Sequence, residues 1–127
     1  MESEVANMES RILLVDDDRL LREVIGECLK HHQYSADMAE DAAAALKLFK
    51  PGRYKLAIID LVMPGMSGLE LMERLLAEDS ELFCLIMTGY PTIDSAYKAM
   101  VEGASDYIIK PFNLSELITA IKQRLGS

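Results

Sequence analysis

The chain has 127 residues, 50% of them hydrophobic and 27% charged, so it can bury the core of one domain and is too apolar for a disordered protein. The 13 basic and 21 acidic residues give a formal net charge of −8, which argues against binding to nucleic acid or to an anionic membrane, because both are negatively charged. We expect a cytoplasmic protein, because no apolar run approaches the length of a membrane span and residues 1–10 lack a signal-peptide core.

Short apolar runs alternate with helical patterns along the chain. Residues 1–10 are predicted to be a disordered leader and residues 11–127 the domain. The apolar runs are typical of buried strands, the second being the weakest, and cover residues 12–15, 34–38, 56–59, 82–87 and 107–109. Apolar residues recur at helical spacing over residues 20–29, 42–49, 69–76, 92–102 and 114–125.

Capping residues support several of these helix ends. Asp41 can cap the helix that begins at residue 42, and Gly103 ends the helix that begins at residue 92. Asn113, with Glu116 three residues later, resembles a capping box for the last helix.

The alternation of strands and helices predicts an α/β fold. Strands joined by helices pair in parallel through right-handed crossovers, and continuous apolar strands fit a sheet that is covered on both faces. Five such units predict a doubly wound five-stranded parallel sheet in the order 2-1-3-4-5, with helices on both faces.

Polar side chains end or follow four of the predicted strands. Asp16 and Asp17 come after the first strand, Asp60 after the third, Thr88 after the fourth and Lys110 after the fifth. In the order 2-1-3-4-5 these four strands are successive neighbours, and open parallel sheets bind ligands at the carboxyl ends of their strands. We therefore expect these side chains to converge on one edge of the sheet.

Phosphoryl transfer is the chemistry that suits this set of side chains. Crowded carboxylates repel one another unless a cation joins them, and oxygen ligands without His or Cys favour Mg²⁺. Asp60 can act as a carboxylate nucleophile that forms an aspartyl phosphate. Lys110 offers a positive charge to phosphoryl oxygens and Thr88 a hydroxyl donor, so the set supplies the positioning and charge neutralisation that phosphoryl transfer needs.

Four motifs together carry a resemblance to a known family. They are Leu14–Asp18 (LVDDD), Ile59–Gly68 (IDLVMPGMSG), Met87–Gly89 (MTG) and Asp106–Phe112 (DYIIKPF). Their combination resembles the receiver domain of two-component response regulators, of the chemotaxis-regulator type, and the similarity covers residues 11–125. The resemblance implies a flavodoxin-like fold.

The resemblance also implies a role for each residue of the acidic cluster. Asp60 matches the phospho-acceptor of the family. Asp16 and Asp17 match the acidic pair that holds Mg²⁺ together with Asp60, and Val62 would give its backbone carbonyl to the metal. The Lys110–Pro111 bond matches the family's cis peptide, which costs only about 0.5–1 kcal/mol at an X-Pro bond.

Further roles concern the response to phosphorylation. Thr88 and Lys110 match the phosphate contacts, and Thr88 and Tyr107 match the pair that switches on phosphorylation. Val62, two residues after Asp60, and Tyr90 match the positions that tune the rate of dephosphorylation. Because neither of these two side chains is suited to orienting water beside the acyl phosphate, we expect slow self-dephosphorylation.

The resemblance names the kinds of partner. The phosphoryl donor would be a phosphohistidine on a sensor histidine kinase or phosphotransfer protein, and the chain would assist only its own phosphorylation and dephosphorylation. The output would lie on the face formed by residues 92–102, 107–109 and 114–125, which would control an output domain or a downstream protein. The sequence stops with the last helix, so we expect the output outside it; a stand-alone regulator, a piece of a longer one and a phosphorylation-dependent homodimer are all left open.

Two alternatives differ from this reading. A haloacid-dehalogenase-like phosphatase would use Asp16 and Asp18 as an Asp-x-Asp pair, but Leu20 stands at the following hydroxyl position and Asp60 would be unexplained. A phosphorylation-independent docking receiver of the same fold would be expected to lose the acceptor or Lys110. Trapping of an acyl phosphate separates the three functions.

Overall fold

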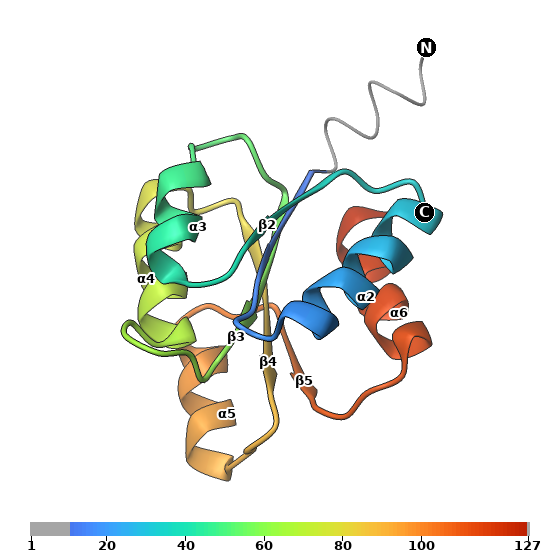
Figure 1. The fold of residues 1–127 in the computed structure, drawn as a ribbon. Helices are drawn as coiled ribbons and strands as arrows, with labels where there is room; N and C mark the ends of the chain where they lie inside the picture. Colours follow the sequence, from blue (N-terminus) through green and yellow to red (C-terminus); the bar gives the residue numbers. More distant parts are fainter. Residues whose placement is uncertain (1–10, 127) are drawn as a thin grey trace.

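Five strands form one parallel sheet in the order β2-β1-β3-β4-β5 (Figure 1). In this computed structural model, which describes residues 11–126, the strands are β1 Ile12–Val15, β2 Ala36–Ala39, β3 Leu56–Asp60, β4 Phe83–Thr88 and β5 Asp106–Ile109. The predicted doubly wound topology is therefore confirmed. The predicted leader over residues 1–10 lies outside the described residues.

Helices cover both faces of the sheet (Figure 1). They are α2 Arg19–His31, α3 Ala42–Leu48, α4 Gly68–Glu78, α5 Ile93–Val101 and α6 Leu114–Leu125. Leu13 and Val15 of β1 pack with α3, α4 and α5, whereas Ile12 and Leu14 pack with α2 and α6. Neighbouring residues of a strand point to opposite faces, so each strand contributes to both halves of the core. None of the helices in the described part of the chain combines the length and apolarity that crossing a membrane requires.

Every described helix begins with a residue whose side chain accepts a backbone N–H. These N-cap residues are Asp18, Asp41, Ser67, Thr92 and Asn113. Each satisfies one of the donors that a helix leaves unpaired in its first turn, which stabilises the helix by about 1 kcal/mol. The caps place the start of α2, α4 and α5 just beyond the ends of β1, β3 and β4, where the site lies.

The predicted capping box of the last helix forms only in part. The Asn113 side chain accepts the Glu116 N–H. The Glu116 carboxylate, however, accepts a hydrogen bond from the side-chain amide of Asn113 rather than from the backbone N–H of Asn113. A complete capping box occurs instead in α5, between Thr92 and Ser95. Serine at the third helical position was not part of the predicted pattern, because the usual box has Glu or Gln there.

The second strand begins two residues later than predicted. Its bounds are Ala36–Ala39 rather than residues 34–38. Gln33 has a φ of 65°, and the N–H of Tyr34 donates to the carbonyl of Leu29, so both residues belong to the turn that ends α2. Tyr34 packs against the part of the core that α2 and α6 share, and its hydroxyl donates to the carbonyl of Gly126 after α6.

The first residue of α4 lies against the backbone of Asp60. A Cβ atom on Gly68 would collide with the carbonyl oxygen of Asp60 and would lie 2.8 Å from the Cα of Leu61. The N–H of Gly68 donates to the carbonyl of Leu61 at 2.9 Å, which closes the loop between them. Glycine is therefore required here by close approach of the backbone, and it keeps the loop after Asp60 tight.

We predict that Gly68→Ala lowers the free energy of unfolding by about 1–3 kcal/mol, because the backbone that carries Asp60 must move. Urea denaturation measures the loss. Gly89→Ala is the matched control, since an added Cβ there would meet only the Cβ of Lys110 at 3.9 Å. The control should stay within about 0.5 kcal/mol of wild type, and an equal loss in both variants would contradict the close-approach argument.

Candidate functional site

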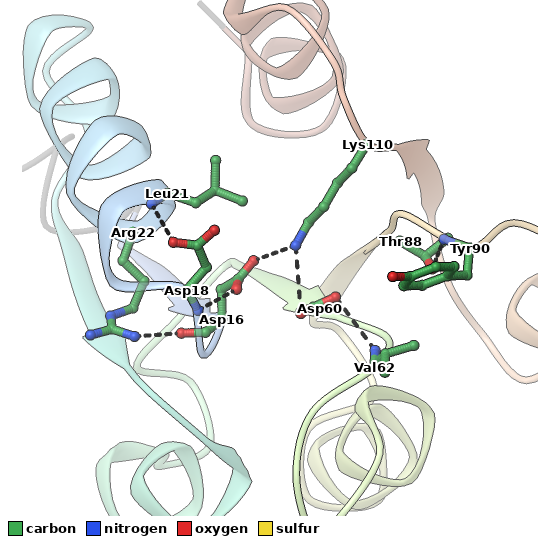
Figure 2. Close-up of polar contacts among 9 residues, drawn as sticks. All are labelled: Asp16, Asp18, Leu21, Arg22, Asp60, Val62, Thr88, Tyr90 and Lys110. Atoms are coloured by element: carbon green, nitrogen blue, oxygen red, sulfur yellow. Dashed lines mark hydrogen bonds and ion pairs between the residues drawn. The ribbon is translucent and has the colours of Figure 1, made fainter.

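The carboxyl ends of four strands bring the predicted side chains to one edge of the sheet (Figure 2). Asp16 follows β1, Asp60 and Thr88 are the last residues of β3 and β4, and Lys110 follows β5. The register pairs Asp60 with Met87 and Thr88 with Ile109, so these strands end at nearly the same level. The strand ends therefore place Asp60 and Thr88 at this edge, and Asp16 and Lys110 directly follow their strands.

Lys110 lies between two buried carboxylates. Its Nζ is 2.9 Å from Oδ2 of Asp16 and 3.5 Å from Oδ2 of Asp60 (Figure 2). Asp16 is fully buried and Asp60 is 5% exposed. Burial by itself lowers the pKa of the Lys110 ammonium, but the hydrogen bond and charge of Asp16, together with those of Asp60, raise it overall. Lys110 therefore stays charged and compensates for carboxylates that burial would otherwise destabilise.

Hydrogen bonds to its side chain and to its backbone carbonyl hold Asp16 at the site. Its Oδ1 accepts the backbone N–H of Asp18 at 2.8 Å, while its other oxygen binds Lys110. The guanidinium of Arg22 donates to the backbone carbonyl of Asp16 at 2.7 Å. Arg22 was not predicted as part of the site. The one feature of the sequence that could have indicated this role is the position of Arg22, one turn into α2 from the cap residue Asp18.

Asp60 has a strongly perturbed carboxyl group. Burial is the largest cause that raises its pKa to about 6, and the negative charge of Asp16 adds to it. Lys110 acts in the opposite direction, as does the N–H of Val62, which donates to Oδ1 of Asp60 at 3.4 Å. A carboxylate with a pKa near 6 is ionised at neutral pH and poorly solvated, as a nucleophile should be.

Three carboxylates lie close enough to hold one metal ion. Asp16, Asp17 and Asp60 each offer an oxygen, and these oxygens lie within 4.8 Å of one another. Asp17 is exposed, whereas the other two are buried. Donors that are all carboxylate oxygen fit a hard cation such as Mg²⁺, so the residues present suit the predicted metal. The metal contact predicted for the Val62 carbonyl stays a prediction.

Thr88 and Tyr107 lie on the same face of the sheet, and in the described structure their side chains bond to other partners. Thr88 is fully buried, and its Oγ1 accepts the N–H of Tyr90 at 3.0 Å. Within residues 11–126 the structure records this hydroxyl only as an acceptor, so its hydrogen is available to a further partner. The ring of Tyr107 is half-buried against the core, and its hydroxyl lies 2.8 Å from Oγ of Ser95, a contact that was not predicted.

The two predicted rate-tuning side chains lie at the surface. Val62 is 55% exposed and Tyr90 is 79% exposed. Tyr90 borders a shallow hollow beside the acidic cluster, which is lined by Leu21, Gly89, Tyr90, Lys110, Pro111 and Phe112. The Lys110–Pro111 peptide bond in this lining is cis, as expected. The tuning roles of Val62 and Tyr90 stay predictions.

Asp18 does not join the cluster. It is exposed, and its side chain accepts the N–H of Leu21 as the N-cap of α2. The haloacid-dehalogenase alternative would need Asp18 to act beside Asp16, and the geometry gives it a capping role instead.

Comparison with known proteins identifies the family. A sequence model of the response regulator receiver domain matches residues 12–122, which is most of the chain. The chain belongs to the response regulator receiver domain family. The sheet and helices described above therefore form a response regulator receiver domain.

Known response regulators are similar to this protein over nearly the whole chain. The response regulator MprA of Mycobacterium sp. (strain KMS) is 35% identical over 118 residues, which cover 93% of this chain and 51% of the relative, so the chain spans about half the length of the curated relatives it matches. The non-phosphorylated HemR receiver domain from Leptospira biflexa has a TM-score of 0.88 at 29% identity, with 93% of this chain and 95% of that chain covered.

A second solved structure has a similar fold. It is a response regulator protein from Burkholderia pseudomallei with a phosphorylated aspartic acid, a calcium ion and citrate. Its TM-score is 0.81 at 26% identity, and the similarity covers 91% of this chain and 68% of that one.

We predict a pH-dependent effect of Asp60→Asn on stability in metal-free buffer. Because the folded-state pKa of Asp60 is raised, wild type is not penalised below the ordinary carboxyl pKa and loses stability as the pH rises through about 6. The Asn variant should therefore be more stable than wild type by about 2–3 kcal/mol at pH 8, with the difference nearly gone at pH 4. Urea denaturation with EDTA measures it, and adding Mg²⁺ should narrow the difference. A difference that is the same at both pH values would contradict the assignment.

Proposed function

We propose that this receiver accepts a phosphoryl group on Asp60 from a phosphohistidine of a sensor histidine kinase or phosphotransfer protein, in the cytoplasm. The observation that carries the proposal is a buried carboxylate with a raised pKa next to the ammonium of Lys110. The solved relative from Burkholderia pseudomallei carries a phosphorylated aspartic acid, which supports the same chemistry here.

The transfer step uses the ionised form of Asp60. A carboxylate oxygen of Asp60 attacks phosphorus, a P–O bond forms, and the P–N bond to the donor imidazole breaks with its electron pair going to nitrogen. Lys110 is placed to bind a phosphoryl oxygen, because its Nζ is already 3.5 Å from the Asp60 carboxylate. The free hydrogen of the Thr88 hydroxyl is a second donor, since Oγ1 is engaged only as an acceptor within residues 11–126.

Asp16, Asp17 and Asp60 are the residues that would hold Mg²⁺, with the Val62 carbonyl as a fourth ligand. When bound, the ion would neutralise negative charge on the phosphoryl oxygens. Lys110 supplies one positive charge against the carboxylates at this edge. The acidic cluster therefore favours a further cation before a phosphoryl group can be accepted.

The switch would act through Thr88 and Tyr107. A phosphoryl group adds about −1.5 to −2 charges and strong acceptor oxygens, and it would draw the Thr88 hydroxyl toward it. The ring of Tyr107 would then move toward the space that Thr88 leaves. Phosphorylation would thus shift the population between two packings of α5, β5 and α6, and this face would control an output domain or downstream protein.

A docking receiver that works without phosphorylation is the second candidate, and an acyl-phosphate assay separates the two. We predict that the protein gains one phosphoryl group from acetyl phosphate in Mg²⁺, and that Asp60→Asn gains none, because the nucleophile is lost. Intact mass spectrometry measures the label. Asp18→Asn keeps the cap of α2 and should label like wild type. Equal labelling of wild type and Asp60→Asn would rule out the acceptor, and no labelling of either would favour docking.

The lifetime of the acyl phosphate gives a further prediction. Val62 has no side-chain group that can orient a water, and the bulky Tyr90 lines the same hollow as Lys110. We expect Val62→Asn with Tyr90→Glu to speed decay on the order of tenfold or more, because amide and carboxylate groups can orient or activate water.

A decay time course of the phosphorylated protein measures this effect. Val62→Ile with Tyr90→Phe is the matched control, because it keeps bulk without adding a group that acts on water, and it should decay like wild type. If the Asn/Glu variant decays no faster than this control, residues other than Val62 and Tyr90 set the lifetime of the acyl phosphate.

A further inference from the structure

A single side chain joins the first turn of α5 to Tyr107. The hydroxyl oxygens of Ser95 and Tyr107 lie 2.8 Å apart. Ser95 is the third residue of α5, and Tyr107 belongs to the neighbouring edge strand β5. The contact therefore links the helix and the strand of the face that is proposed to respond to phosphorylation.

The hydrogen bonds of Ser95 assign the donor in this contact. Oγ of Ser95 accepts the N–H of Thr92 at 3.2 Å and donates to the Thr92 carbonyl at 3.1 Å. A serine hydroxyl has one hydrogen and two lone pairs, so its remaining lone pair can accept the O–H of Tyr107. This arrangement satisfies all three contacts at once. The capping box of α5 and the hydroxyl of Tyr107 thus depend on the same oxygen atom.

Little apolar burial holds α5 on the sheet. Ala99 is its only buried residue, whereas α4 buries Gly68, Leu71, Met72 and Leu75. Ile93, in the first turn of α5, is 90% exposed. Figure 1 shows α5 at one end of the layer that it forms with α3 and α4. The Ser95–Tyr107 contact therefore adds a polar link between α5 and β5 where apolar burial of the helix is slight.

Tyr107 has only a short way to move before this contact breaks. It lies opposite Ile86 in the register, and Thr88 is two residues further along β4 on the same face. The hydroxyl oxygens of Ser95 and Tyr107 are 2.8 Å apart, so a displacement of the ring that Ser95 does not follow breaks their hydrogen bond. Moving Tyr107 and losing the Ser95 contact are then one event.

Building on the function proposed above, in which Tyr107 moves toward Thr88, we propose that Ser95 is a positioning residue that holds Tyr107 in its resting place. The Ser95–Tyr107 hydrogen bond stabilises the resting packing and has no counterpart once Tyr107 has moved. It therefore opposes the switch and sets how strongly a phosphoryl group must bind to drive it.

The test compares three variants of the full chain. Ser95→Ala removes the acceptor of Tyr107, Ser95→Thr keeps a hydroxyl, and Thr92→Ala weakens the same capping box but leaves the Ser95 hydroxyl in place. NMR of the tyrosine rings, with Tyr107→Phe to assign the signals, reports the position of Tyr107 in the ligand-free protein. Titration with beryllofluoride and Mg²⁺, followed on the amides after Asp60, reports the affinity for a phosphoryl mimic.

Ser95→Ala should move the Tyr107 ring signals toward their positions in beryllofluoride-bound wild type. It should also raise the affinity for beryllofluoride by roughly two- to tenfold, the equivalent of one neutral hydrogen bond. Ser95→Thr and Thr92→Ala should leave both readouts close to wild type. The proposal is overturned if Ser95→Ala leaves the ring signals in place, or if Thr92→Ala changes them equally, since the cap would then be the cause.

Failure of the proposed function would look different. Beryllofluoride would then bind no better to wild type than to Asp60→Asn. In that case the ring signals of ligand-free Ser95→Ala and Thr92→Ala still decide whether Ser95 holds Tyr107.

Discussion

The contact between Lys110 and two buried carboxylates is the interaction on which the site depends. Asp16 and Asp60 have lost nearly all contact with water, and a buried carboxylate is tolerated only when a cation or several donors compensate it. Lys110 provides that compensation at 2.9 Å and 3.5 Å. The compensation is incomplete, because burial and Asp16 still raise the pKa of Asp60 to about 6. In the proposed function, the same imbalance of charge would favour attack by the Asp60 carboxylate and binding of a cation.

The sheet topology is what makes this contact feasible. Asp16 and Lys110 are separated by 94 positions in sequence, and no local structure could bring them together. Parallel strands end at a common edge, and the order β2-β1-β3-β4-β5 places β3 and β4 between the strands that precede Asp16 and Lys110. Helices α2, α4 and α5 begin just beyond β1, β3 and β4, so their N-terminal N–H groups also surround an edge that is rich in negative charge. The strand order of the fold is therefore what assembles the site.

The sequence allowed this edge to be predicted because strand ends are marked by polar residues after apolar runs. Asp16, Asp60 and Lys110 needed only the strand order to be placed together. The start of β2 was not predicted correctly, because Tyr34 is apolar for a reason that periodicity does not show: it closes the end of α2 and contacts the residue after α6. Ser95 and Arg22 were missed for a related reason. Their partners are backbone carbonyls or a hydroxyl on another element, and such contacts have no spacing rule in the sequence.

The distribution of apolar burial then explains which part of the molecule can respond to a change of charge. The helices α2, α4 and α6 each bury two or more residues completely, so moving them would cost core packing. Helix α5 buries Ala99 alone and carries exposed Ile93, Tyr97 and Val101 on its outer surface. In the proposed function, a new charge at Asp60 would act on Thr88, at the end of the strand that leads into α5. It would thus reach the helix that buries the fewest residues among the described helices. Elements that switch are drawn from the less stable parts of a fold, and here that part is joined through β4 to the sheet edge that carries Asp60.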